Sequence, residues 1–462
     1  KENFFNISLL DKISESFSDY LFNQGINFFD VGIKEKVTVN NVDIIFEIES
    51  TEVKYVNQIN IYGNNRTLEE VIRREVTFAE GDSVTDLLIS KTNKNLQRLN
   101  IFNKVDITEQ NIDDEYVDIN IDVNEKSTGE FNIGLSVGSL DGASFMTKLK
   151  ENNFLGTGRN AELEVNTSSS NTVYNAKVVE PYFLNKNLSL ITGLGYSEKD
   201  YSQSASYNVN SINTNIGINY EITEDLFHNI SLLYDLKDYE VTNASLVSSS
   251  IAASEGTNAN FYLNNYITYS KLNSFINPTR GGFIQYKNVL SPITNSTNGS
   301  LKNVILLKKY IPFADNSYTF SYQSRIGNIL SLQDTELKSD EKFSLGGRWL
   351  RGFDNYGVGP RKSKTSYIGG NNIIAVKLDL KKPLIQNSDN PVDLNLFTDF
   401  GTVYGNKTDP TFNTNSIRAS YGFGFNFYSP IGPIGFSWGF PISDESHDIK
   451  RMFNFNIGNL DW

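Results

Sequence analysis

Most of the 462-residue chain alternates between apolar and polar residues with a period of two. From about Gly129 to the C-terminus there are roughly sixteen alternating segments of about 8 to 14 residues, separated by turn residues. Because successive side chains of a strand point to opposite faces, each segment predicts a strand with one apolar face. An even number of such strands predicts a 16-stranded antiparallel transmembrane β-barrel with an apolar exterior.

A large soluble β-sandwich is the alternative fold for this pattern. The even number of segments and the aromatic residues at strand ends, such as Tyr182-Phe183 and Phe425-Phe427-Tyr428, favour the barrel. Short turns alternate with long Ser-, Gly- and Asn-rich connections at 242–256 and 332–370. This alternation is typical of a barrel with one rim of tight turns and one rim of loops.

Composition argues against several other classes of protein. No apolar run reaches the roughly 18 residues of a membrane helix. The formal net charge is -13 and the Lys and Arg residues do not cluster, so we expect no nucleic-acid partner. Cysteine is absent and the two histidines, His228 and His447, are predicted to lie in loops or at the surface, so we expect no metal and no cofactor.

One short motif suggests an enzyme. Gly134-Leu135-Ser136-Val137-Gly138 matches the G-x-S-x-G pattern of esterases, in which the serine occupies a sharp turn between a strand and a helix. Here the five residues continue the alternation begun at Phe131 and Ile133, and no helical pattern follows. We therefore predict a strand without catalytic function, and no enzyme.

Residues 53–127 have the pattern of one compact α+β module. Strand-like alternation at Ile59 and Ile61 precedes two helical patterns, whose predicted start signals are Thr67 with Glu70 and Ser83 with Asp86. Two more strand-like segments follow, the second with strict alternation from Val117 to Val123.

Residues 1–52 resemble the rear half of a second module of this kind. A helical pattern from Leu9 to Phe22 is followed by alternation from Val42 to Ile48. Repetition at this scale indicates modules in tandem, so we expect further modules upstream of Lys1. The predicted domains are therefore 1–52, 53–127 and a barrel over 128–462.

The long loop 332–370 carries the sequence Leu350-Arg351-Gly352-Phe353. The guanidinium of an arginine holds carboxylates through two parallel hydrogen bonds, and a glycine permits close backbone approach. The motif fits an ionic latch inside a pore, and it fits a solvated surface loop equally well.

The order of the motifs along the chain resembles the superfamily that joins polypeptide-transport-associated (POTRA) modules to an outer-membrane barrel. The segments that carry the resemblance are VNQINIYGNN, EEVIRREVTFAEGD, LQRLNIFNKVDI, STGEFNIGLSVGS, NNFLGTGRNAEL, VVEPYF, NPTRGGF, FTDFGTVYG, SPIGPIGFSWGFPI and FNFNIG. The resemblance covers essentially the whole chain. It implies a bacterial outer-membrane protein with POTRA modules in the periplasm.

The resemblance also implies roles for individual residues. In this superfamily the loop arginine, here Arg351, meets acidic residues on nearby strands, which match Asp379 and Asp399. Gly401 is expected to let a neighbouring strand approach closely, although a bulge or turn would explain this glycine equally well. A water-filled lumen is expected to screen the ion pair. The complete implied latch is Leu350, Arg351, Gly352, Phe353, Asp379, Asp399 and Gly401.

The implied function is insertion and folding of outer-membrane β-barrel proteins through a lateral seam between the first and last strands. The seam residues are Phe131, Ile133, Gly134, Ser136, Gly138, Phe453, Phe455, Ile457 and Gly458. The implied partners are unfolded barrel clients, accessory lipoproteins docking at Arg73, Arg74 and Glu80, periplasmic chaperones and the lipid bilayer. The charges of Arg73, Arg74 and Glu80 fit ordinary solvated surface residues equally well. The alternative is a polypeptide translocase of the same superfamily, either TamA-like or a two-partner secretion transporter.

Overall fold

The computed structural model describes residues 10, 13–14, 16–18, 20–21, 29–37, 42–50, 53–140, 142–274, 277–294, 298–333, 335–385, 391–406, 410–429 and 432–458. The chain divides into two compact units. One comprises Lys1–Gly129 with Glu151–Arg159, and the other comprises Glu130–Lys150 with Asn160–Trp462.

At the start of the first unit, β1 (Phe29–Val37) and β2 (Val42–Ser50) form an antiparallel hairpin. Within the predicted helix from Leu9 to Phe22 the structure describes residues 10, 13–14, 16–18 and 20–21, and all of these are helical. The predicted alternation from Val42 to Ile48 coincides with β2.

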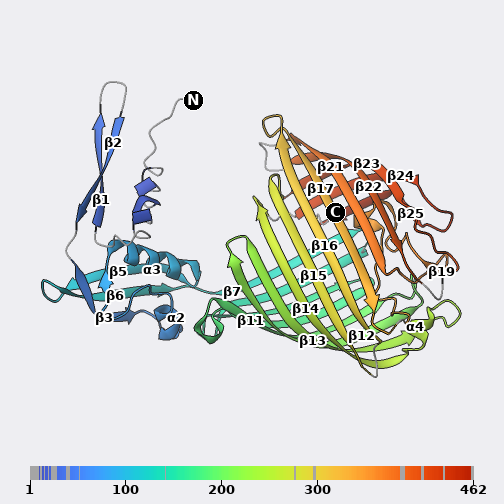
Figure 1. Cartoon of the computed structure of the whole chain (residues 1–462), viewed down its shortest axis with the longest axis horizontal. Coiled ribbons are helices and arrows are strands. Elements are labelled where there is room, and N and C mark those ends of the chain that lie inside the picture. Colours follow the sequence, from blue (N-terminus) through green and yellow to red (C-terminus); the bar gives the residue numbers. More distant parts are fainter. Residues whose placement is uncertain are drawn as a thin grey trace. The chain divides into compact units, whose positions relative to one another are not determined.

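The predicted α+β module is present in the first unit (Figure 1). Its elements are β3 (Lys54–Tyr62), α2 (Glu69–Arg73), β4 (Ser83–Val84), α3 (Asp86–Arg98), β5 (Phe102–Asn111) and β6 (Tyr116–Glu125). The four strands form one sheet in the order β4-β3-β6-β5, with β3 and β6 parallel. The alternating residues of β6 face the helices, and Val117, Ile119 and Ile121 are completely buried.

Both predicted helix starts are wrong. The helix α2 begins after Leu68, because Glu125 accepts the backbone N–H groups of Arg66 and Thr67, and the Thr67 hydroxyl accepts a hydrogen bond from Asn153. The N-cap of α3 is Thr85, whose hydroxyl accepts from the backbone N–H of Leu88.

The second N-cap prediction fails because Ser83 pairs with β3 in the strand β4. Both N-cap errors have the same cause. In each case the predicted N-cap residue interacts with another part of the first unit: the Thr67 hydroxyl accepts from Asn153, and Ser83 pairs with β3.

The predicted sixteen-stranded antiparallel barrel is confirmed, and it runs from β7 in cyan to β26 in red (Figure 1). Its strands are β7 (Gly129–Gly138), β8 (Gly142–Phe154), β9 (Arg159–Ser168), β10 (Asn171–Glu180), β11 (Leu188–Asp200), β12 (Tyr207–Thr223), β13 (Leu226–Val241), β14 (Gly256–Leu272), β15 (Gly281–Ile293), β16 (Asn298–Phe313), β17 (Tyr318–Ser331), β21 (Asn372–Ile385), β22 (Val392–Tyr404), β23 (Arg418–Ser429), β24 (Gly432–Ser443) and β26 (Phe453–Ile457). Each strand pairs with its neighbour in this order, and β26 returns to β7. No helix among the described residues is long and apolar enough to cross a lipid bilayer.

The connections between the barrel strands contain short helices and short strands. They are η1 (Phe183–Asn185), α4 (Ser249–Ala252), η2 (Gly347–Trp349), β18 (Gly352–Phe353), β19 (Arg361–Ser363), β20 (Ser366–Tyr367) and β25 (Lys450–Arg451). Four of these, η2, β18, β19 and β20, belong to the predicted long loop between β17 and β21.

The prediction that each histidine lies in a loop or at the surface is wrong for His228 and confirmed for His447, which lies in a loop. His228 lies within β13 and its ring nitrogens contact Tyr220 and Asn265. His447 lies in the β24–β25 connection, but it is buried because its ring stacks on Phe412 and faces Asp448. His447 is buried because the β24–β25 connection packs against another connection of the barrel, which contains Phe412.

Candidate functional site

The long loop packs its apolar residues against the inner wall of the barrel. Its buried side chains include Leu337, Phe343, Leu345, Leu350, Phe353 and Val358, and they contact Val304, Ile329, Ile373, Ala375 and Val403 of the strands. Burial of apolar surface is the main force that holds such a segment, at about 25 cal/mol per Å² removed from water. The loop is therefore a packed part of the barrel interior.

Arg351, in the predicted latch motif, contacts both predicted carboxylates. Its Nε and Nη2 donate to Asp399 at 2.8 and 2.6 Å, and its Nη1 donates to Asp379 at 2.7 Å. The backbone N–H of Arg351 also donates to Asp399, at 2.9 Å. The guanidinium lies over the Phe397 ring, 3.6 Å from its centroid. The fork geometry fixes the position of the loop tip on β21 and β22.

The expected screening of this ion pair by water is wrong. Arg351 is 5% exposed and Asp399 is completely buried, because the packed loop covers both residues. A buried ion pair is costly to desolvate, and removing one partner leaves an uncompensated buried charge.

Gly401 lies beside this cluster, and its close neighbour is a loop side chain. A Cβ atom at Gly401 would be 2.8 Å from Cδ2 of Leu345 and 3.0 Å from the backbone oxygen of Ile374. The absence of a side chain at Gly401 therefore makes room for Leu345. The close strand neighbour expected from the sequence is also present, because Ile374 belongs to β21.

A second arginine cluster was not predicted from the sequence. Arg451 of β25 donates from Nε and Nη2 to Asp354, at 2.9 and 3.0 Å, and from Nη1 to the backbone oxygen of Ser139 at 2.6 Å. We call Arg451, Asp354 and Ser139 the seam clasp. The seam clasp joins three parts of the chain. Asp354 directly follows the latch motif, Arg451 lies in β25 just before the last strand, and Ser139 directly follows the first strand. The one sequence feature that could have indicated this cluster is the position of Asp354, which directly follows Phe353 of the latch motif.

Backbone contacts support the seam clasp. The strand β18 pairs with β25 through Gly352 with Arg451 and Phe353 with Lys450. The Asn355 amide donates to the backbone oxygen of Leu140 at 3.3 Å. The loop tip thus touches both sides of the junction between the first and last strands.

The strands β7 and β26 close the barrel. Among the described residues they pair at two positions, Gly138 with Asn456 and Val137 with Ile457. Beyond the pairs, the Ser139 N–H donates to the Phe455 oxygen at 3.0 Å.

The predicted seam residues lie at this junction or along β7. Gly458 has a positive φ of 91°, and a Cβ there would be 2.3 Å from the Leu135 oxygen, so only glycine fits against β7. On the outer face, Phe131 is 66% exposed and Ile133 is similarly exposed, while Phe453 packs on Trp438.

Two further seam residues contact the next strand instead. A Cβ at Gly134 would meet Met146, and the Ser136 hydroxyl contacts the Ser144 hydroxyl at 2.5 Å. The Ser136 hydroxyl thus contacts a serine of β8, and Ser136 lies within the continuous strand β7 and not at a sharp turn.

Two of the predicted docking residues, Arg73 and Glu80, pair with each other in the module. Arg73 donates to Glu80 at 3.1 Å and to Glu69 at 2.6 Å, and its side chain is half-exposed. The pKa of Glu80 lies below its usual value because its own backbone N–H and the Arg73 guanidinium stabilise the carboxylate. Arg74 lies apart from this pair, next to Glu75 and against Gly158.

Comparison with known proteins gives the same architecture. A POTRA model, described as a surface antigen variable number repeat, matches residues 54–126, and a model of the Omp85 superfamily domain matches residues 153–460. The outer membrane protein assembly factor BamA of Neorickettsia risticii is 25% identical over 90% of this chain and 56% of that protein. BamA of Nitratidesulfovibrio vulgaris is 24% identical over 100% of this chain and 58% of that protein.

The chain therefore spans a little more than half the length of these curated relatives. The crystal structure of BamA from Haemophilus ducreyi lacking POTRA domains 1-3 has the same fold, with a TM-score of 0.84, 24% identity, and coverage of 99% of this chain and 94% of that chain. Because the Omp85 model covers residues 153–460, well over half of the sequence, the chain belongs to the Omp85 superfamily.

Proposed function

We propose that this protein assembles outer-membrane β-barrel proteins by inserting them through the seam between β7 and β26. The relatives of the chain that carry a curated name are outer membrane protein assembly factors, which supports the class of function. The observation that carries the mechanism is the closure of the barrel between β7 and β26, where Gly138 and Gly458 each lie directly against the partner strand.

Opening of this seam would free the edge of the first strand. The unpaired N–H and C=O groups of a strand edge are a template for another strand. A client strand satisfies these groups by adding to the edge, as in other complexes formed by β-augmentation. The exposed side chains of Phe131 and Ile133 then give the growing hairpin an apolar surface compatible with lipid.

Insertion by this route needs no nucleotide. Once a client's strands are paired and closed, every backbone polar group is satisfied inside the bilayer, and burial of the apolar face in lipid is downhill. The protein lowers the barrier to that state. The glycines of β7 help because a strand interior without side chains packs weakly and separates more easily.

The latch and the seam clasp hold the loop while the seam opens and closes. Arg351 anchors the loop tip to β21 and β22. Arg451 anchors Asp354, three residues further along the loop, to both sides of the seam. We infer that the latch is permanent and that the half-exposed clasp is the contact that breaks on opening.

The module supplies the contacts with other components. Arg73 and Glu80 form a half-exposed ion pair to which accessory lipoproteins are proposed to dock, and periplasmic chaperones deliver the unfolded clients. Paired surface charges contribute little to the stability of the module itself, so they are free to be used in recognition.

A disulfide across the seam tests the mechanism. The chain contains no cysteine, so a pair introduced as Val137→Cys and Ile457→Cys is unique, and directly opposed strand residues have the spacing that a disulfide requires. The matched control is Ala176→Cys with Leu194→Cys, which are opposed residues of β10 and β11.

Insertion of a client barrel into lipid vesicles is then measured for both pairs, oxidised and reduced. We expect the seam disulfide to stop insertion, reduction to restore it, and the control disulfide to leave it unchanged. Equal insertion by the oxidised and reduced seam pair would contradict the mechanism and favour transport through the lumen.

A further inference from the structure

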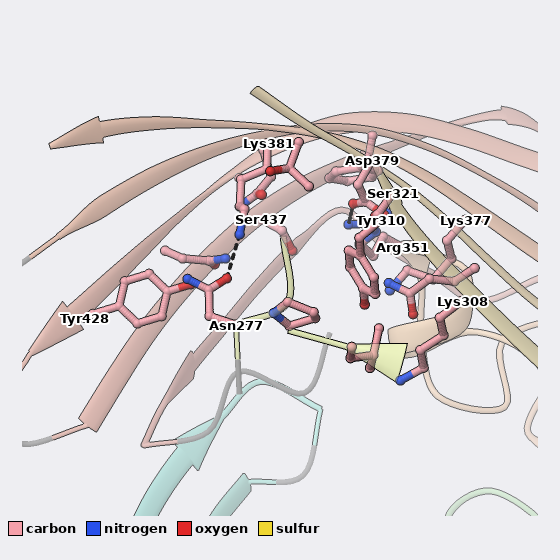
Figure 2. Close-up of a pocket in the computed structure, with 18 of the residues that line it drawn as sticks. Asn277, Lys308, Tyr310, Ser321, Arg351, Lys377, Asp379, Lys381, Tyr428 and Ser437 are labelled. Carbon is pink, nitrogen blue, oxygen red and sulfur yellow. Dashed lines mark hydrogen bonds and ion pairs between the residues drawn. The ribbon is translucent and has the colours of Figure 1, made fainter. Parts of the chain in front are cut away.

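A cavity of about 220 Å³ lies inside the barrel next to Arg351, on the inner faces of β16, β17, β21 and β22. It is far larger than the roughly 10–15 Å³ that one water molecule requires. Its wall is polar and basic, and it includes Lys308, Gln323, Lys377 and Lys381. Figure 2 shows Lys308 and Lys377 beside Arg351 and Asp379 on one side of the cavity, and Lys381 with Asn277 on the other.

The strand register places three of these side chains in one row. Lys308 lies opposite Gln323, and Gln323 lies opposite Lys377. Adjacent strands are about 4.8 Å apart, so the backbones of the two lysines are separated by about 10 Å, with the glutamine between them. Two long, flexible ammonium side chains at this separation can converge on one ligand above the glutamine amide.

The burial of Lys377 is the main argument that the cavity binds a ligand. Lys377 is 2% exposed, and within the described residues its ammonium group has neither a hydrogen bond nor an ion pair at contact distance. A buried ammonium group without partners carries a large desolvation penalty. Of the carboxylates in this cluster, Asp399 is held by Arg351 through both oxygens and Asp379 through Oδ1 alone.

The charges around the cavity leave an excess of one positive charge. Lys381 is neutralised by Asp393 at 3.8 Å and donates to Asn277 at 2.5 Å. Of the remaining groups, the cations are Arg351, Lys308 and Lys377, and the anions are Asp379 and Asp399. A single oxyanion would balance this set.

We propose that the cavity binds a small oxyanion of the phosphate class, held by the ammonium groups of Lys308 and Lys377 and by the amide of Gln323. The phosphate group is either a free ion or part of a glycerophosphate headgroup, and the same three side chains recognise both. The site does not depend on the proposed function, because it is built from the inner wall of the barrel and not from the seam.

Binding is measured by the broadening of the ³¹P NMR signal of inorganic phosphate when the detergent-solubilised protein is added, with the ionic strength held constant by sodium chloride. The variants are Lys377→Gln and Lys308→Gln. The matched control is Lys287→Gln, a lysine of β15 that lies over the Tyr266 ring and does not line the cavity. Lys308→Gln keeps the test decisive if Lys377→Gln disturbs folding, because Lys308 lies two strands from Lys377.

We expect the wild type and Lys287→Gln to bind phosphate equally and each cavity variant to bind about tenfold more weakly, which is the usual effect of one charge-assisted contact. A repeat with glycerol 3-phosphate identifies the source: equal affinity indicates a headgroup, and selective binding of inorganic phosphate indicates the free ion. Absence of phosphate binding by the wild type, or equal binding by all four proteins, would overturn the site.

Discussion

Arg451 and Asp354 are 97 residues apart in sequence, yet they are joined by two parallel hydrogen bonds of 2.9 and 3.0 Å. Because Arg451 also donates to the Ser139 oxygen, one side chain contacts the loop and the end of the first strand. The same loop is anchored by Arg351 to β21 and β22. The loop therefore has one buried attachment to the barrel wall and one half-exposed attachment at the seam.

Loss of the seam clasp should loosen the seam with little effect on stability. The Arg451 and Asp354 side chains are 38% and 26% exposed, so solvent screens the pair and Arg451→Gln should cost less than about 1 kcal/mol. The Ser139 amide, which donates to Phe455, should exchange its hydrogen about fivefold faster, as a local opening of that size implies. Hydrogen exchange measured by mass spectrometry checks this. The control is Lys450→Gln, whose lysine pairs with Asp444, and equal exchange in the two variants would refute the clasp.

Loss of the buried latch should have a much larger effect. Arg351→Ala leaves Asp379 and Asp399 without their cation, and breaking such a pair typically costs about 3–5 kcal/mol. We expect the barrel to form, the loop to become sensitive to protease, and client insertion to slow. Lys364→Ala, at an exposed position of the same loop, is the control. A protease-resistant loop and normal insertion in Arg351→Ala would show that the latch has no such role.

Gly401→Ala tests whether the loop depends on close approach to β22. The new Cβ would be 2.8 Å from Leu345 and 3.0 Å from the Ile374 oxygen, so the loop must move, at a cost of about 1–3 kcal/mol. The cost should be smaller when Leu345 is also changed to Ala, since the two changes affect one contact. A double-mutant cycle on the unfolding free energy measures this. Strictly additive effects would mean that Leu345 is not the neighbour that Gly401 accommodates.

Glu125 should make the module's stability depend on pH. Burial alone would raise the pKa of Glu125, but hydrogen bonds from Thr67 and from the Arg66 backbone outweigh it and lower the pKa. A lowered pKa means that the carboxylate stabilises the folded module above the ordinary pKa of a glutamate, and that this stabilisation is lost as the pH falls through the lower, folded value. The thermal unfolding temperatures of wild type and Glu125→Gln should therefore differ at about pH 7, and this difference should shrink progressively as the pH is lowered below the ordinary pKa of a glutamate. Glu115→Gln, in an exposed turn, is the control, and a difference that persists at low pH would contradict the assignment.

The barrel and the module were predictable because their patterns are local. Alternation with period two and helical spacing act over a few residues, and a strand with one apolar face has few ways to bury it. The Arg351 contacts were reached through the resemblance, since no spacing rule links Arg351 to Asp399.

The errors arose where distant segments compete for one side chain. Thr67 has the correct sequence for a helix start, but its hydroxyl accepts from Asn153, 86 residues away. The seam clasp and the burial of His447 likewise depend on how connections fold against each other. Such contacts are set by tertiary packing, so a short sequence window does not contain them.

The most direct test of the central claim is to trap a client strand during insertion and map its disulfides to the protein. Single cysteines are placed at Phe131, Ile133 and Leu135 on β7, and at Gln323 and Tyr310 on the inner wall. If clients enter through the seam, the client's edge strand forms disulfides with the β7 cysteines in a register that shifts by two residues from one position to the next. Disulfides with Gln323 and Tyr310, and none with β7, would contradict the account and indicate passage through the lumen.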